Sequence, residues 1–334
     1  MGEVRSTMEY YDLSEEQLTK RQHYVPRTYL KEFSFDDQKV PHVYAVFPKT
    51  KEAVSVSIEK ICCQSYLYEQ IAVDSDSGAH IFAAPNELEG FFSANEGRYA
   101  AIISKLKSDL QEKDDFELAE DEISALKGFM SLLVWRNPIF VHISNAVVDK
   151  FYAQDPEYIK YIQKEFPEVP TNVIISHLAH DFLKKQLIIS MLALFDTMED
   201  SQICIFKTTD SSFITSAIPV RNIYGEKNGI EYDLIGMPIT PDLFLAFVDV
   251  ETVLPKVVTI DEGSVKRINS RQLGGSKNIL ISNRKDLLSF VDFSFEIEAD
   301  QDDSWLYSMF SVDKETALKQ YNEIMNAKEN KYWR

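Results

Sequence analysis

The chain has 334 residues, of which 45% are hydrophobic and 12% aromatic, and this composition excludes a disordered or collagen-like protein. Asp and Glu number 53 against 35 Lys and Arg, so the formal net charge is −18. Such a surplus of negative charge repels a phosphate backbone at long range, and we therefore expect no broad nucleic-acid binding. A local basic patch is still compatible with this balance.

Cysteine usage and hydropathy predict a cytoplasmic protein without a membrane partner. Cys62, Cys63 and Cys204 are too few for a disulfide framework, and two of them are adjacent, so we expect reduced thiols. The most apolar run, 187–195, is about half as long as a membrane span and predicts a buried helix instead. The N-terminus is polar and lacks the apolar run of a secretory signal.

The N-terminal part of the chain predicts short helices followed by a hairpin. A capping box at Ser14 and Gln17 opens one helix, and a helical turn is expected after Pro26. β-Branched and aromatic residues then form two runs separated by a polar segment, which is typical of a hairpin. The helical turn is predicted at 28–33, the hairpin strands at 42–47 and 53–58, and a polar surface loop at 74–78.

The middle of the chain predicts helices, and the part after Asp200 predicts a mostly antiparallel sheet. Apolar residues recur at spacings of three and four from 87 to 106, from Ile123 to a break at Pro138, and from 173 to 198. Later apolar runs are short and bounded by turn residues. The expected elements there are strands at 203–206, 213–216, 230–235, 243–248 and 278–281, and helices at 264–273 and 313–332.

This order of elements indicates an α+β fold, with a mostly antiparallel sheet built from both chain ends around a helical middle region. We expect an N-terminal segment, 1–19, followed by a single α+β domain, 20–334, with a helical insertion at about 86–200. A division into two domains near Ser201 is the alternative, although the composition there is not that of a linker.

Residues 20–31 are the segment with the clearest potential for chemistry, because they gather basic residues and two tyrosines in an acidic chain. His23 lies shortly before Pro26, where extended backbone lets a side chain face a cleft, and histidine acts as acid, base or metal ligand near neutral pH. Arg21 and Arg27 carry guanidinium groups suited to phosphate or carboxylate. The simpler alternative is that His23 only satisfies a buried carbonyl group.

A series of motifs resembles the domain of unknown function 4238 family, a widespread and largely bacterial group without a settled activity. The motifs are Gln22-His23-Tyr24-Val25-Pro26 with Tyr29-Leu30, then Arg136-Asn137-Pro138, FITSAIPV at 213–220, Pro238-Ile239-Thr240-Pro241 and Ile268-Asn269. The likeness covers about residues 20–285. It implies one site drawn from distant segments, namely from His23, Glu89, Glu96, Arg136 and Asn269.

One position departs from the family pattern. The family usually carries Asp-Asn where this chain has Ala217-Ile218, both apolar. If that aspartate is catalytic or binds a metal, the resemblance implies that this chain has lost the activity or moved the role to another residue.

The acidic residues of the implied site have a chemical and a structural interpretation. Glu89 and Glu96 are seven residues apart, so on a helix they lie two turns apart on nearly the same face. A carboxylate there with His23 suits proton transfer or a divalent metal, and Arg136 suits an anionic oxygen. In the structural interpretation, Glu89 belongs to a capping box with Asn86, and Glu96 forms a buried ion pair with Arg136.

A second metal candidate lies on the long helix expected at 173–198. His177, His180 and Asp181 lie about one turn apart, a spacing that can bind zinc. No further Cys or His pair stands at the spacing of a metal site, so the three residues also fit the polar edge of a buried helix.

Three functions remain as hypotheses. The first is a hydrolase, such as a nuclease-like effector, that acts on a phosphate-containing substrate. The second, favoured by Ala217-Ile218, is a non-catalytic binding or regulatory protein that uses the same pocket, and the third is an acidic protein-interaction module. A divalent metal is compatible with the site, and the oligomeric state is left open. The expected catalytic residues are His23, Glu96 and Arg136, and the expected substrate contacts are Arg21, Arg27, Glu89 and Asn269.

Overall fold

The computed structural model describes residues 18–35, 39–47, 50, 52–73, 80–198, 200–227, 230–249, 254–273 and 278–292. The chain divides into two compact units: unit 1 is Met1–Gln22, Gln64–Phe92 and Pro138–Ile188, and unit 2 is His23–Cys63, Ser93–Asn137 and Ile189–Arg334. The helical middle of the chain therefore contributes to both units. The single domain expected at 20–334 stays a prediction, and the elements expected at 14–17, 74–78 and 313–332 lie outside the described residues.

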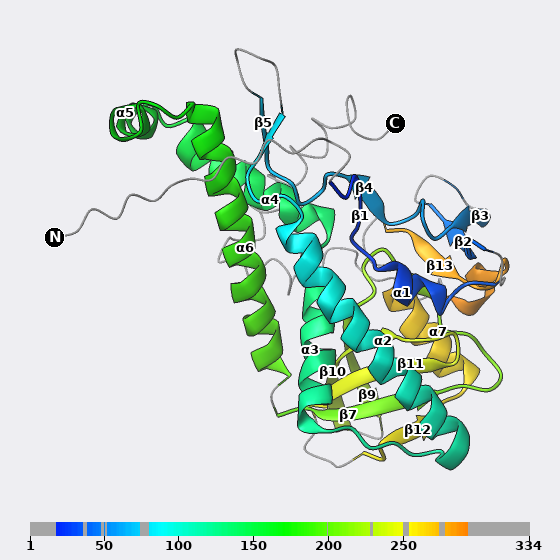
Figure 1. Cartoon of the computed structure of the whole chain (residues 1–334). Helices are drawn as coiled ribbons and strands as arrows, with labels where there is room; N and C mark the ends of the chain where they lie inside the picture. The colour runs from blue at the N-terminus through cyan, green and yellow to red at the C-terminus, as the bar shows by residue number, and fades with distance from the viewer. Residues whose placement is uncertain are drawn as a thin grey trace. The chain divides into compact units, whose positions relative to one another are not determined.

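Unit 2 contains an antiparallel sheet in the order β12-β7-β11-β10-β9, which comes entirely from the C-terminal half of the chain (Figure 1). Among the described strand pairs of this sheet, β12 and β7 are parallel, and the other pairs are antiparallel. The core on this sheet combines Cys204, Phe244 and Ala246 with Val265 of the following helix, all fully buried. The elements are β7 Gln202–Lys207, β9 Arg221–Lys227, β10 Ile230–Pro238, β11 Leu243–Asp249, β12 Val257–Thr259 and α7 Glu262–Arg271.

A second sheet of unit 2 is built from both ends of the chain, as the sequence predicts. Its order is β3-β2-β13-β8, and the predicted hairpin is present, with His42 opposite Ser57. β13 then inserts between the hairpin and β8, so Leu280 lies opposite Val46 on one side and Ser216 on the other. The strands are β2 His42–Val46, β3 Val54–Ser57, β8 Thr215–Ser216 and β13 Leu280–Ser282.

The helices of unit 2 place the polar residues of the next section. The short α1, Arg27–Lys31, confirms the predicted helical turn, and α3, Glu120–Trp135, runs beside the part of α2, Glu87–Lys113, that belongs to this unit. Inside the pair, the Tyr99 ring stacks on that of Phe129 at a centroid distance of 3.8 Å.

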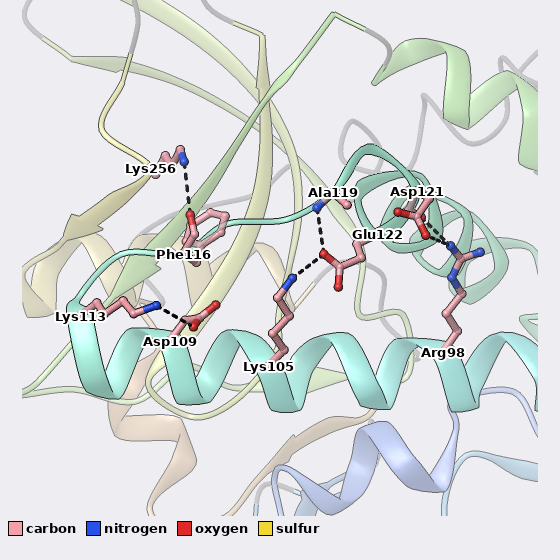
Figure 2. A network of polar contacts seen from close by, with 9 residues as sticks. All are labelled: Arg98, Lys105, Asp109, Lys113, Phe116, Ala119, Asp121, Glu122 and Lys256. Carbon is pink, nitrogen blue, oxygen red and sulfur yellow. Dashed lines mark hydrogen bonds and ion pairs between the residues drawn. The ribbon is translucent and has the colours of Figure 1, made fainter.

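The outer side of the same helix pair carries ion pairs (Figure 2). Lys105 Nζ lies 2.7 Å from Glu122 Oε2, which also accepts a hydrogen bond from the backbone N–H of Ala119, and Arg98 contacts Asp121 at 2.8 Å. Exposed pairs of this kind each stabilise a fold by about 1 kcal/mol or less. The buried aromatic stack therefore contributes more to the position of the two helices than this network does.

Unit 1 is mostly helical. Its helices are α4 Pro138–Val148, a π-helical turn Asp149–Ala153, α5 Pro156–Glu165 and the part of α6 Thr171–Thr197 that ends at Ile188. Pro138 begins α4 directly after the end of α3, which confirms the predicted break. The short strands of unit 1 are β5 Ile71–Val73, paired with β6 His80–Phe82. A further pair is β1 Arg21–His23 with β4 Cys63–Ser65, of which His23 and Cys63 belong to unit 2.

The long helix predicted at 173–198 is present as α6, but its apolar run is not buried throughout. Ile188, Ile189 and Leu192 have exposed fractions of 43%, 60% and 52%. The expectation of a buried helix at 187–195 is therefore wrong for these three side chains, because apolar character all around a helix does not say which side packs against the protein. Among the described residues, no helix is both long and apolar enough to cross a membrane.

Candidate functional site

A cleft of about 490 Å³ opens in unit 2 around α1. Its walls come from α1 and the turn that follows it, from the segment that enters β2, from the turn that follows β3 and from α2. Pro26 precedes α1 in an extended conformation, and this directs the chain into the short helix that forms one wall. The lining residues are Arg27, Thr28, Lys31, Ser34, Lys39, Val40, Pro41, Ile58, Glu59 and Glu96.

The cleft carries more positive than negative side chains. Arg27, Lys31 and Lys39 face two carboxylates, those of Glu59 and Glu96, so the lining has a formal charge of 3 − 2 = +1 in a chain of −18. Arg27 Nη1 lies 3.8 Å from Glu59 Oε1, a long and solvent-exposed contact. Within the part of the chain that the structure describes, Lys31 and Lys39 are exposed and have no ion-pair partner. Their ammonium groups are therefore available to an anion.

Arg136 joins two residues that the sequence assigned to the same site. It is only 2% exposed, its Nη1 donates to Glu96 Oε1 at 2.8 Å, and its Nη2 donates to the backbone carbonyl of His23. Glu96 lines the cleft, whereas Arg136 does not. Arg136 therefore holds the carboxylate of Glu96 in place from behind the cleft wall, which is the structural interpretation of this pair.

The imidazole of His23 is not among the groups that line the cleft. Its Nε2 is 3.1 Å from the carbonyl oxygen of Ile58, and Ile58 lines the cleft. This contact agrees with the simpler alternative, in which the histidine satisfies a carbonyl group. A catalytic role of His23 stays a prediction.

The other expected contacts are distributed between the two units. Arg27 lines the cleft, whereas Arg21 and Glu89 belong to unit 1. Asn269 is fully buried in unit 2, and its amide binds the backbone of two segments: Oδ1 accepts from Ile214 N, and Nδ2 donates to the carbonyls of Ser212 and Phe290. Asn269 thus connects loops around α7 and does not line the cleft.

Three charged lining residues, Lys31, Lys39 and Glu59, were not among the expected site residues. Lys31 lies in the basic segment, so its chemistry was visible in the sequence even though its position was not. Lys39 and Glu59 stand next to strands of the hairpin and give no sequence signal, because charged residues at such places are ordinary surface residues. Only the folded structure brings them into the same cleft as Glu96.

A separate polar cluster in unit 1 accounts for His180 of α6. His180 is 4% exposed, and its Nε2 lies 2.8 Å from Glu87 Oε2, while Lys184 contacts the other oxygen of Glu87. The hydrogen bond from Lys184, together with that of His180, lowers the pKa of Glu87. Among the described residues, no group of three or more His, Cys, Asp or Glu side chains is arranged to hold a metal ion.

Glu69 is a second acid of unit 1, and its environment has the opposite effect. Its Oε1 accepts hydrogen bonds from Gln22 Nε2 at 2.8 Å and from the backbone N–H of Asn86 at 3.2 Å. The carboxyl group is largely buried, and this desolvation raises its pKa above the ordinary value of 4.5 in spite of the two donors.

We expect Glu69→Gln to raise the melting temperature of the protein at about pH 8 and to leave it nearly unchanged at about pH 3.5. A carboxyl group whose folded-state pKa is raised stabilises the fold fully below its unfolded pKa, and this contribution is lost as the pH rises through the folded pKa. Glutamine keeps an acceptor for both donors and has no charge to desolvate. Thermal unfolding of both proteins at the two pH values measures the effect.

Glu87→Gln is the matched control, because the pKa of Glu87 is shifted the other way. A lowered pKa gives stability that is present above the unfolded pKa and is lost as the pH falls through the folded pKa. This variant should therefore lower the melting temperature at about pH 8 and have little effect at low pH. Shifts of the same sign in the two variants at pH 8 would contradict the assignment of the two environments.

Comparison with known proteins identifies a family but no characterised relative. No curated protein and no solved structure matches the chain. The family described as "Protein of unknown function (DUF4238)" matches residues 21–286, a range that contains every residue lining the cleft. This match confirms the resemblance predicted from the sequence motifs, and the chain belongs to the DUF4238 family of proteins of unknown function.

Proposed function

We propose that the cleft of unit 2 binds a small phosphate-bearing ligand. One observation carries this proposal: Arg27, Lys31 and Lys39 line the same cleft in a chain whose net charge is −18. Hydrogen bonds from ammonium and guanidinium groups to phosphate oxygens are among the strongest in proteins. Phosphate is the anion best suited to three such cations, because it offers several oxygens around one centre.

The size and polarity of the cleft support a small ligand. Pockets for small molecules commonly have volumes of about 300–1,000 Å³, and the cleft, at about 490 Å³, lies within this range. Its two carboxylates are poorly suited to a long polyanion, since each would repel a neighbouring phosphate. They are well suited to the hydroxyl groups of a sugar or polyol, from which they accept hydrogen bonds.

Hydrolysis of the bound ligand is a second candidate function, and the presence of Glu59 and Glu96 in the same cleft favours it. A carboxylate beside a bound phosphate ester can accept a proton from an attacking water. Binding is nevertheless better supported, since Glu96 is hydrogen-bonded to Arg136 and the His23 ring to a backbone carbonyl. Phosphate release from ATP by wild type and by His23→Ala tests hydrolysis, and equal rates in the two proteins would reject His23 as a catalyst.

Calorimetric titration with pyrophosphate tests the binding proposal. We expect wild type to bind pyrophosphate, and we expect Lys31→Gln and Lys39→Gln each to raise the dissociation constant about ten-fold or more, because a hydrogen bond to a charged group is worth about 1.5–3 kcal/mol. Lys160→Gln, at an exposed lysine of α5 in unit 1, is the matched control and should bind as wild type does. Wild type without measurable binding, or lysine variants with unchanged affinity, would contradict the proposal.

A further inference from the structure

We infer that the ligand of this cleft is a sugar phosphate and that Glu96 recognises a hydroxyl group of its sugar; the inference rests on the proposed phosphate-binding function and adds the class of the ligand. Glu96 lines the cleft, and its side chain is 20% exposed. Its Oε1 accepts a hydrogen bond from Arg136, which does not line the cleft. Within the part of the chain that the structure describes, the other carboxylate oxygen has no hydrogen-bond partner. Glu96 therefore keeps one acceptor for a ligand.

The position of this carboxylate is fixed before a ligand arrives. Arg136 is only 2% exposed, and it donates both to Glu96 Oε1 at 2.8 Å and to the backbone carbonyl of His23. An acceptor that is already held in place loses little side-chain freedom when a ligand binds. Glu59, the second carboxylate of the cleft, has a side chain that is 45% exposed. Glu96 is therefore the carboxylate to which we assign recognition.

The charges around Glu96 favour a hydroxyl group over an amine as its partner. Four cations, the three of the lining and Arg136, stand against two carboxylates, which gives a formal charge of 4 − 2 = +2. The guanidinium of Arg136 is always charged, so it repels a ligand ammonium group that approaches Glu96. A hydroxyl group is neutral and donates one hydrogen bond to the carboxylate at no such cost.

The apolar part of the lining matches the remainder of a sugar. Val40, Pro41 and Ile58 line the same cleft as the charged residues. A sugar ring carries hydroxyl groups at its edge and C–H groups on its faces, so it needs polar and apolar contacts together. A chain of phosphates has no apolar part. The mixed lining therefore fits a sugar phosphate better than an inorganic polyphosphate.

Two ligands that differ in their hydroxyl groups test this inference by calorimetric titration. Ribose 5-phosphate and tetrahydrofurfuryl phosphate share the five-membered ring and the phosphate, but the second has no hydroxyl group. A hydrogen bond to a charged group strengthens binding about ten-fold or more, so we expect wild type to prefer ribose 5-phosphate by this factor. In Glu96→Gln we expect the preference to fall to about three-fold, because the amide is neutral. Pyrophosphate should bind this variant at least as tightly as wild type, since a negative charge is removed.

A matched variant makes the result specific to Glu96. Glu112→Gln changes an exposed glutamate of the same helix α2, 16 residues or about 24 Å further along, and should keep the ten-fold preference. A ten-fold preference that persists in Glu96→Gln would overturn the role of Glu96. An equal loss of affinity for all three ligands in Glu96→Gln would also overturn it, because a purely structural role weakens them together.

The wild-type protein alone separates failure of this inference from failure of the phosphate site. Equal affinity for the two furanose phosphates, with pyrophosphate still bound, would overturn the inference while the phosphate site stands. Binding of 3-aminopropyl phosphate ten-fold or more tightly than ribose 5-phosphate would overturn it in favour of an amine. Absence of binding by pyrophosphate and by both furanose phosphates would instead reject the phosphate site itself. These comparisons need no variant, so they hold whatever the stability of Glu96→Gln.

Discussion

Arg136→Met is expected to lower the free energy of unfolding of unit 2 by about 3 kcal/mol, the lower end of the range for breaking a buried ion pair. Arg136 is almost completely buried, and it donates to the carboxylate of Glu96 and to the carbonyl of His23. Methionine fills much of the same volume but leaves both acceptors without this donor. The cost stays near the lower end because the side chain of Glu96 is 20% exposed and can reach water through the cleft. Chemical denaturation of both proteins measures the difference.

The double variant Arg136→Met/Glu96→Met separates the ion pair from simple loss of packing. With both charges removed, no uncompensated carboxylate remains, so at least half of the lost stability should return. A double variant as unstable as the sum of the two single variants would contradict the view that Arg136 acts through Glu96.

Gly236→Ala is the second substitution with a large expected effect, a loss of about 3 kcal/mol in stability through overpacking. Gly236 lies in β10 opposite Ala246 of β11, and an added Cβ would collide with the ring of Phe244 and lie 2.7 Å from the carbonyl oxygen of Leu245. Phe244 is fully buried in the core of the five-stranded sheet and has little room to move. The melting temperature should therefore fall by several degrees or more.

Gly128→Ala in α3 is the control, and we expect the opposite sign. An added Cβ there meets no atom within 4 Å, and alanine stabilises the interior of a helix over glycine by about 0.5–1 kcal/mol. A similar loss of stability in both variants would show that the close approach at Gly236 is not the cause.

The fold class and most element positions were predictable because they depend on local patterns. Runs of β-branched and aromatic residues gave β2, β3, β7 and β11, and helical periodicity gave α2, α3 and α6. β9 was not predicted, since its sequence RNIYGEK contains a glycine and charged residues in place of an apolar run. Its long pairing with β10, from Lys227 opposite Ile230 to Arg221 opposite Gly236, compensates for this weak preference.

The division of the strands between the two larger sheets was not predictable from local pattern. The alternation of apolar and polar residues shows which side of a strand is buried, but it does not identify the neighbouring strand. The insertion of β13 between β2 and β8 brings together residues more than 200 positions apart, and only long-range packing determines it.

The candidate site was predictable only in part. The sequence motifs pointed to His23, Glu96 and Arg136, which the structure connects through hydrogen bonds of Arg136. Asn269 fits the same family pattern, but its amide binds backbone groups, and a side chain–backbone hydrogen bond across 55 residues leaves no sequence signal. Lys39 reaches the cleft because the hairpin folds beside α1, which residue type alone does not reveal.

A crystal of the full chain soaked with tungstate, a heavy-atom analogue of phosphate, gives the most direct test of the account. Anomalous scattering from tungsten would locate the anion without any assumption about the natural ligand. We expect a peak within hydrogen-bond reach of Arg27, Lys31 and Lys39, and its loss in a Lys31→Gln/Lys39→Gln double variant. A strong peak elsewhere on the protein with none in this cleft would contradict the assignment of the cleft as a phosphate site.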